Sequence, residues 1–164
     1  MLSRRTMVAM ALTAVGMVGV GSLSETSVAQ AGCIVMRGLA LGTWDLPPSG
    51  PGSLGTIDGD LFLNGVALYK FSGTIEEEGS PCLSCRQGSF SGTLDDGIGI
   101  GPDYEVSGTW FGSFFSGQGT WRGVISKPVG PALIPVGRLR GVYNDPFSPP
   151  GPAGTFAARW VLCD

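Results

Sequence analysis

Residues 117–125 read Gly-Gln-Gly-Thr-Trp-Arg-Gly-Val-Ile, and this stretch shows the rule on which most of the chain is built. Taken with a period of two, one face carries glycine, tryptophan and isoleucine, while the other carries glutamine, threonine, arginine and valine. Side chains of a β-strand point alternately to two faces. The pattern therefore predicts a strand that presents bulky apolar residues and glycine to one side.

The triplet Gly-Thr followed by a large apolar residue recurs in the same phase. Copies begin at Gly42, Gly55, Gly73, Gly92, Gly108, Gly119 and Gly154, with a degenerate copy at Gly141. Glycine weakens a strand interior because it loses backbone entropy and packs nothing, so its regular use needs a reason. We interpret the glycines as positions where the sheet curves and where a ring from a neighbouring strand covers the backbone. A flexible glycine-rich chain is the alternative, which the in-phase aromatic residues disfavour.

Turn and loop residues divide the chain into about eight such segments, with no helical period between them. The predicted strands are Cys33–Asp45, Leu54–Asn64, Val66–Glu77, Gln87–Asp95, Tyr104–Phe114, Gly117–Ser126, Val136–Tyr143 and Gly154–Cys163. Asn64-Gly65 is typical of a tight hairpin turn, and Lys127–Pro135 is predicted to be a proline-rich connection. The sequence predicts an all-β, single-domain antiparallel meander that closes as an up-and-down barrel, with a two-sheet β-sandwich as the alternative.

Residues 1–31 are predicted to be a secretory signal peptide. Two arginines precede the apolar run Met7–Gly21, which is too short to span a bilayer comfortably, and small residues stand at positions 29 and 31. Residues 3–7 also resemble a twin-arginine motif, so Sec and Tat export both stay open. We expect residues 32–164 to form one exported domain, located in the periplasm, outside the cell or on the cell surface.

Export changes the interpretation of the four cysteines, because an oxidising compartment favours disulfides. Four cysteines allow three pairings. If the first and last strands are neighbours, as closure requires, Cys33 can pair with Cys163, which is the pairing we predict. Cys82 and Cys85 then pair with each other. A redox-active C-x-x-C and a four-cysteine zinc site are the alternatives.

Charge is sparse in this chain and the set of catalytic residue types is narrow. The net charge is −3 and there is no histidine, which excludes Ser-His-Asp and Cys-His machinery and His-ligated metals. No basic patch dense enough for nucleic acid is evident, and Arg138 with Arg140 is interpreted as a solvated strand face. Asp58 and Asp60 share a strand face and are expected to be solvated rather than a glycosidase-like pair.

Two further acidic groups have simple interpretations. The run Glu76–Glu78 is expected to face solvent. The carboxylates from Asp95 to Glu105 surround a glycine-rich bend, where a turn is the expected role and a calcium site the alternative. We predict no catalytic residues, no cofactor and no metal ligands.

Gly42-Thr43-Trp44 resembles the G-x-W motif that opens lipocalin and avidin barrels, which are eight-stranded meanders that bind small ligands inside. Arg159 is similar in placement to the arginine that lipocalins lay across that tryptophan. The resemblance covers four residues and implies a barrel more than it implies ligand binding.

These observations predict a non-enzymatic binding module that holds a small apolar ligand or a cell-surface protein. The alternative is a structural or interaction protein of the bacterial envelope without a ligand pocket. An integral membrane protein is not expected. If a site exists, the loops Pro47–Gly52, Gly79–Arg86 and Asn144–Pro152 are the expected place, because loops on a rigid scaffold commonly carry function.

Overall fold

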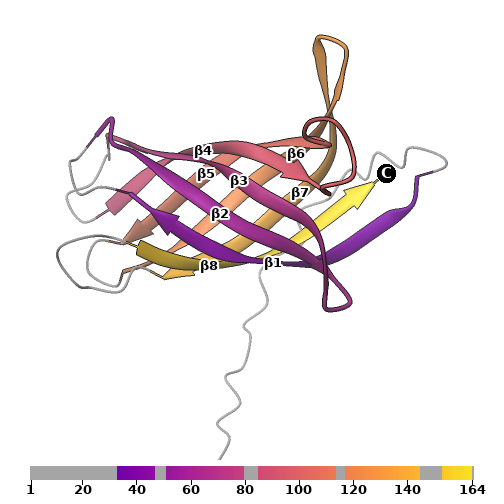
Figure 1. Cartoon of the computed structure of the whole chain (residues 1–164). Helices are drawn as coiled ribbons and strands as arrows, with labels where there is room; N and C mark the ends of the chain where they lie inside the picture. The colour runs from indigo at the N-terminus through magenta and orange to yellow at the C-terminus, as the bar shows by residue number, and fades with distance from the viewer. Residues whose placement is uncertain (1–32, 47–50, 80–84, 114–116, 145–152, 164) are drawn as a thin grey trace, which may run out of the picture. The chain divides into compact units, whose positions relative to one another are not determined.

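The chain forms a closed barrel of eight strands, each antiparallel to the next, and β8 returns to pair with β1 (Figure 1). The computed structural model describes residues 33–46, 51–79, 85–113, 117–144 and 153–163. The strands are β1 (Val35–Asp45), β2 (Leu54–Leu63), β3 (Val66–Glu78), β4 (Cys85–Asp95), β5 (Tyr104–Ser113), β6 (Gln118–Val129), β7 (Ala132–Asn144) and β8 (Ala153–Cys163). The predicted meander and its closure into a barrel are confirmed. The described part of the chain contains no helix that could cross a bilayer.

Closure brings the two ends of the domain together. Val35 pairs with Cys163 at one end of the β1–β8 ladder, and Cys33 forms a disulfide with Cys163 across a Cα–Cα distance of 5.4 Å. This predicted bridge is confirmed. Cys85 is also disulfide-bonded, but its predicted partner Cys82 lies outside the described residues.

The inner face of the barrel holds the core. All four tryptophans are at most 4 % exposed. They alternate along their strands with glycine or a small residue, while the intervening threonine, serine and arginine side chains lie outside. The buried aromatic residues are Trp44, Phe71, Phe90, Tyr104, Trp110, Trp121, Tyr143, Phe156 and Trp160. The predicted division into an apolar inner face and a polar outer face is confirmed.

Many of the inner glycines lie beneath these rings. A Cβ added to Gly112 or Gly119 would enter the space of the Tyr143 ring. The same arrangement places Phe156 over Gly42 and Gly59, Phe90 over Gly108 and Gly123, Phe71 over Gly92, Trp110 over Gly88, Trp44 over Gly154 and Trp160 over Gly38. Glycine is used here because the ring, together with a carbonyl oxygen of the neighbouring strand at most of these positions, takes the space of a side chain.

The rings also meet across the middle of the barrel. Phe71 on β3 and Phe156 on β8 have centroids 6.4 Å apart, at an angle of 85°. Trp121 on β6 lies 5.0 Å from Phe90 and 5.0 Å from Phe156. Edge-on and tilted pairs of this kind are the preferred aromatic contacts. The central part of the lumen is therefore occupied by the protein's own side chains.

Two connections show how well turns could be predicted. Asn64 and Gly65 both have positive φ, 51° and 82°, which is the hairpin turn that the sequence predicts. The prediction of a connection at Lys127–Pro135 is wrong, because β6 continues to Val129 and β7 begins at Ala132. The proline residues are tolerated because this part of the hairpin pairs only with itself, and Figure 1 shows it projecting from the barrel.

We predict that Gly119→Ala destabilises the barrel by about 1–3 kcal/mol or more, because the methyl group collides with the Tyr143 ring and the backbone of Phe111. Gly79→Ala is the matched control, since nothing lies within 4 Å of a Cβ added there. Urea denaturation of both variants measures the difference. Equal stability of the two variants would contradict the close packing of rings on glycine.

We also predict that replacing both Cys33 and Cys163 with serine lowers stability by about 4–5 kcal/mol, the loop-closure entropy of a bridge between distant residues. The two cysteines are separated by 130 positions. The denaturant midpoint of the double variant measures the loss. An unchanged midpoint would show that the bridge adds nothing to closure.

Candidate functional site

The outer wall formed by β6, β7 and β8 carries a row of arginines. Cross-strand pairing places Arg122 directly opposite Arg140, and Arg140 directly opposite Arg159. Residues opposite each other in an antiparallel pair have Cβ atoms about 4.5–5.5 Å apart, and like charges there repel. This row is electrostatically unfavourable unless something negative lies over it.

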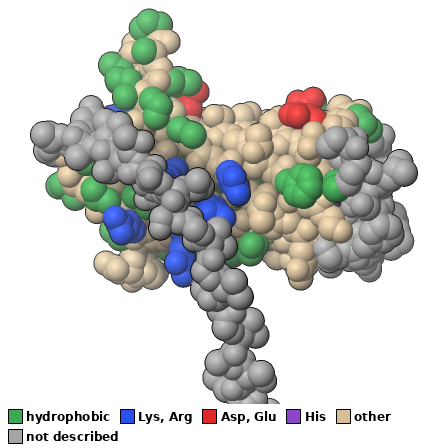
Figure 2. Space-filling model, turned by 180° about the vertical axis from the view of Figure 1, so that it is seen from behind, with side chains coloured by type: hydrophobic (Ala, Val, Ile, Leu, Met, Phe, Trp, Pro, Cys, Tyr) green, Lys and Arg blue, Asp and Glu red, His purple; other side chains and the backbone are tan. Residues whose placement is uncertain are grey.

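Two more arginines extend the row toward the disulfide end of the barrel. Arg138 stands opposite Val161, which in turn stands opposite Arg37 on β1. We call the five exposed residues of this wall the arginine surface: Arg37, Arg122, Arg138, Arg140 and Arg159. Figure 2 shows basic side chains gathered on the barrel wall below the projecting hairpin.

Carboxylates are concentrated elsewhere. Strands β6, β7 and β8 contain no aspartate or glutamate, and β1 contains only Asp45, at the opposite end from Arg37. The exposed acidic residues on strands β2 to β5 are Asp58, Asp60, Glu76, Glu78, Asp95 and Glu105. The barrel thus has a basic wall and an acidic wall.

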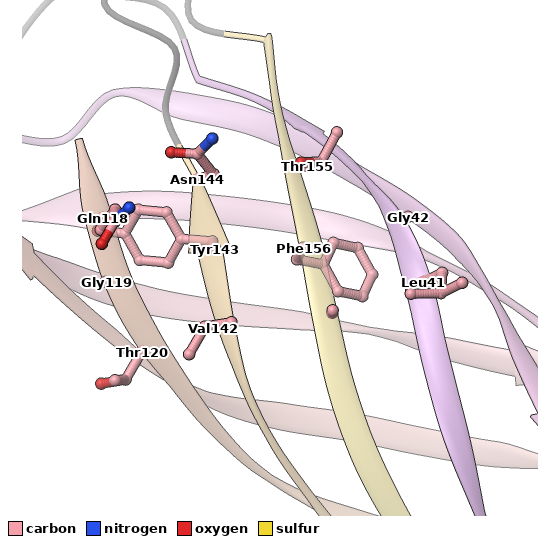
Figure 3. Close-up of a pocket in the computed structure, with 11 residues that line it drawn as sticks. Leu41, Gly42, Gln118, Gly119, Thr120, Val142, Tyr143, Asn144, Thr155 and Phe156 are labelled. Atoms are coloured by element: carbon pink, nitrogen blue, oxygen red, sulfur yellow. The ribbon is translucent and has the colours of Figure 1, made fainter. Parts of the chain in front are cut away.

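An open hollow of about 800 Å³ adjoins the arginine surface. An apolar row crosses three strands there, formed by Leu41 on β1, Ala157 on β8 and Val142 on β7. Val142 and Ala157 are each two residues along their strand from an arginine of the row. Polar side chains of Gln118 and Thr155 stand at its edge (Figure 3). Val142 is 59 % exposed, so the hollow offers apolar area to a partner beside a line of guanidinium groups.

A buried ion pair occupies the inner face at the barrel end where β3 leads into β4. Arg86 Nε donates to Glu77 Oε1 at 2.9 Å, and Arg86 Nη2 donates to Oε2 at 2.7 Å. The Arg86 guanidinium lies 5.8 Å from the centroid of Trp110. The prediction that the whole run Glu76–Glu78 faces solvent is therefore wrong for Glu77. The strand period turns Glu77 inward, and its charge is matched there by Arg86.

Three of the four tryptophans form a cluster around one tyrosine. The Tyr143 ring is met edge-on by Trp44, Trp110 and Trp121, with centroids 5.7, 6.0 and 6.0 Å away. The indole nitrogens of Trp44 and Trp121 are buried and have no hydrogen-bond partner among the described residues. Arg159 is exposed on the outer face, so the arginine-on-tryptophan contact implied by the lipocalin resemblance is absent for Trp44.

The acidic bend forms a compact group of carboxylates. Oxygens of Asp95, Asp96 and Asp103 lie within 4.8 Å of one another. Backbone N–H groups already bond to them: Asp96 N to Asp103 Oδ2 at 2.8 Å, Gly97 N to Asp95 Oδ1 at 2.7 Å and Ile98 N to Asp96 Oδ1 at 2.8 Å. These bonds build the turn, and we assign the carboxylates that role.

The other predicted positions are distributed as follows. Asp58 and Asp60 are exposed on the outer face of β2, as expected for solvated residues. The strand ends that adjoin the three predicted site loops share one end of the barrel (Figure 1). Most residues of the loops themselves lie outside the described residues.

Comparisons with protein-family models, with curated proteins and with solved structures give no match. The arginine surface and the hollow beside it are therefore the features from which a function is inferred.

Sequence reasoning missed the arginine surface. Arg138 and Arg140 were expected to be solvated, and Arg37 and Arg122 had no predicted role. The sequence alone shows that each arginine alternates with the inner residues of its strand and so belongs to the outer face. Their gathering depends on the register between four strands, two of which meet only on closure.

We predict that Glu77→Gln lowers stability by about 1–3 kcal/mol, because it leaves a partly buried guanidinium without its countercharge. The side chains of Arg86 and Glu77 are 16 % and 11 % exposed. Glu76→Gln makes the same chemical change on the outer face and is expected to have little effect. Thermal unfolding of the two variants compares them, and equal midpoints would contradict the importance of the pair.

Proposed function

We propose that this protein is an exported, non-enzymatic binding module that holds an anionic partner on its arginine surface and the adjoining hollow. The observation that carries the proposal is the row Arg122, Arg140 and Arg159, aligned on three adjacent strands that contain no carboxylate. Like charges directly opposite one another cost stability. A negatively charged partner would offset this repulsion, because the guanidinium groups attract it.

The chemistry of guanidinium narrows the kind of partner. Arginine presents a planar fork of donors that matches carboxylate, sulfate or phosphate oxygens two at a time. The apolar row of Leu41, Ala157 and Val142 supplies contact area for a nonpolar part of the same partner. Nucleic acid remains an unfavoured partner in this proposal, because the opposite wall is acidic and the net charge is −3.

Export is supported by two independent features. The first 31 residues have the pattern of a secretory leader. The Cys33–Cys163 bridge joins the ends of the domain, and disulfides of this kind persist in oxidising compartments.

The second candidate function is a structural or interaction protein of the envelope without a ligand pocket. The aromatic contacts that cross the lumen favour it over a module that holds a ligand inside the barrel. Both candidates place the interaction on the outside, and they differ in whether the arginine surface is the contact.

We predict that Arg140→Gln weakens binding to dextran sulfate roughly tenfold, since hydrogen bonds to charged groups are worth about 1.5–3 kcal/mol. Lys70→Gln removes the same charge from an exposed position on β3 in the acidic wall and is expected to change binding by less than about twofold. Biolayer interferometry on dextran sulfate, with uncharged dextran as reference, makes the measurement. Equal weakening by the two variants, or equal binding to both polymers, would overturn the proposal.

A further inference from the structure

The hairpin that joins β6 to β7 extends past its neighbours as an arm, which we define as residues 126–136. Pairing of β6 with β5 ends at Ser126, and pairing of β7 with β8 begins at Gly137. Beyond that point, the two strands of the arm pair only with each other. The arm stands out from the barrel in Figures 1 and 2.

The arm is apolar and exposed near its tip. Val129, Leu133 and Ile134 are 51 %, 51 % and 41 % exposed, and Pro128, Pro131 and Ala132 are exposed beside them. No acidic residue occurs between positions 126 and 137, and the single charge is Lys127. Register pairs Pro128 with Leu133 and Lys127 with Ile134, so apolar side chains stand on both faces of the hairpin. Such exposure is typical of a surface that meets an apolar partner.

The backbone edges of the arm are poorly suited to adding another strand. Proline has no N–H and fits a ladder only where its nitrogen faces away from the paired strand. Pro128 and Pro135 therefore leave the outer edges of the arm short of donors. Proline on an edge is a common means of blocking edge-to-edge pairing. The exposed side chains at the tip are therefore better suited to contact a partner than its backbone edges.

The arginine surface begins where the arm ends. Arg138 lies five positions after Leu133 on the same strand, a distance of about 17 Å at roughly 3.3 Å per residue. The apolar tip and the first arginine of the barrel wall thus follow one another along β7. Amphipathic helices on a membrane surface bury their apolar face about 5–10 Å into the headgroup and acyl boundary, and we take the same depth for the arm. A tip inserted to that depth would leave Arg138 and its neighbours facing the phosphates.

We propose that the arm inserts into the surface of an anionic lipid bilayer while the arginine surface lies against its headgroups. This inference rests on the proposed function, because it names the anionic partner. A bilayer offers both chemistries at one surface, with anionic headgroups for the arginine surface and an apolar interior beneath them for the tip. The prolines at the edges disfavour strand addition by a second copy.

The test measures partition of the naturally processed protein onto vesicles by co-sedimentation, with phosphatidylcholine alone or with added phosphatidylglycerol. We expect binding to the anionic vesicles, weakened by high salt. Leu133→Ser combined with Ile134→Ser is expected to lower partition by roughly tenfold or more, because two apolar side chains no longer leave water. The control is Leu54→Ser combined with Val66→Ser, which removes two exposed apolar side chains from β2 and β3, strands that do not pair with β6 or β7, and should leave partition unchanged.

Insertion depth gives a second measurement. A tryptophan introduced by Leu133→Trp is expected to be quenched by lipids brominated on the acyl chains. Thr56→Trp, on the exposed face of β2, is expected to add no quenched fluorescence. Loss of this difference would contradict insertion.

Three results would overturn the inference. They are unchanged partition of the arm variant, absence of wild-type binding to anionic vesicles, and self-association through the arm in sedimentation velocity without lipid. Binding of dextran sulfate separates this failure from a failure of the proposed function. Wild-type protein that binds dextran sulfate but not vesicles refutes the lipid inference alone, whereas failure to bind dextran sulfate refutes the proposed function.

Discussion

The contact between bulky rings and bare glycine backbone is the constraint on which this barrel depends. An eight-stranded barrel has an interior just wide enough for side chains to fill it. Nine buried aromatic residues of the described part of the chain enter that space, and many of them lie over a glycine of the adjacent strand. A Cβ at those glycines would push the rings inward, where they already meet one another. The glycine repeat and the aromatic core are therefore two parts of one packing solution.

That packing solution also leaves the outer wall as the place where we propose that binding occurs. The centre of the lumen is occupied, and the inner ion pair of Glu77 and Arg86 is satisfied within the wall. The outer wall is where charge is distributed unevenly, with arginines on one side and carboxylates on the other. The arm adds an exposed apolar tip next to the basic side. The exterior of this barrel thus has a basic side and an acidic side, whereas the described interior has no such division.

Features that depend on residues close together in the sequence could be predicted, whereas features that depend on the pairing of distant strands could not. Strand phase is local, so all eight strands and the burial of Trp44, Trp110, Trp121 and Trp160 could be predicted. The Cys33–Cys163 pair followed from closure. The arginine surface could not be predicted, because it depends on register between strands distant in sequence. Glu77 was placed on the outer face because its charge was given more weight than its phase in the strand. The arm was predicted to be a loop because proline was taken to break a strand, although a strand that pairs on one side only accepts proline.

Nuclear magnetic resonance of the native protein tests the packing of rings on glycine most directly. The account predicts nuclear Overhauser effects between the Hα protons of Gly112 and Gly119 and the ring of Tyr143, with ring-current shifts of those glycine resonances. The same should hold for Gly88 beneath Trp110. Glycine Hα resonances at random-coil positions, with no contact to any ring, would contradict it.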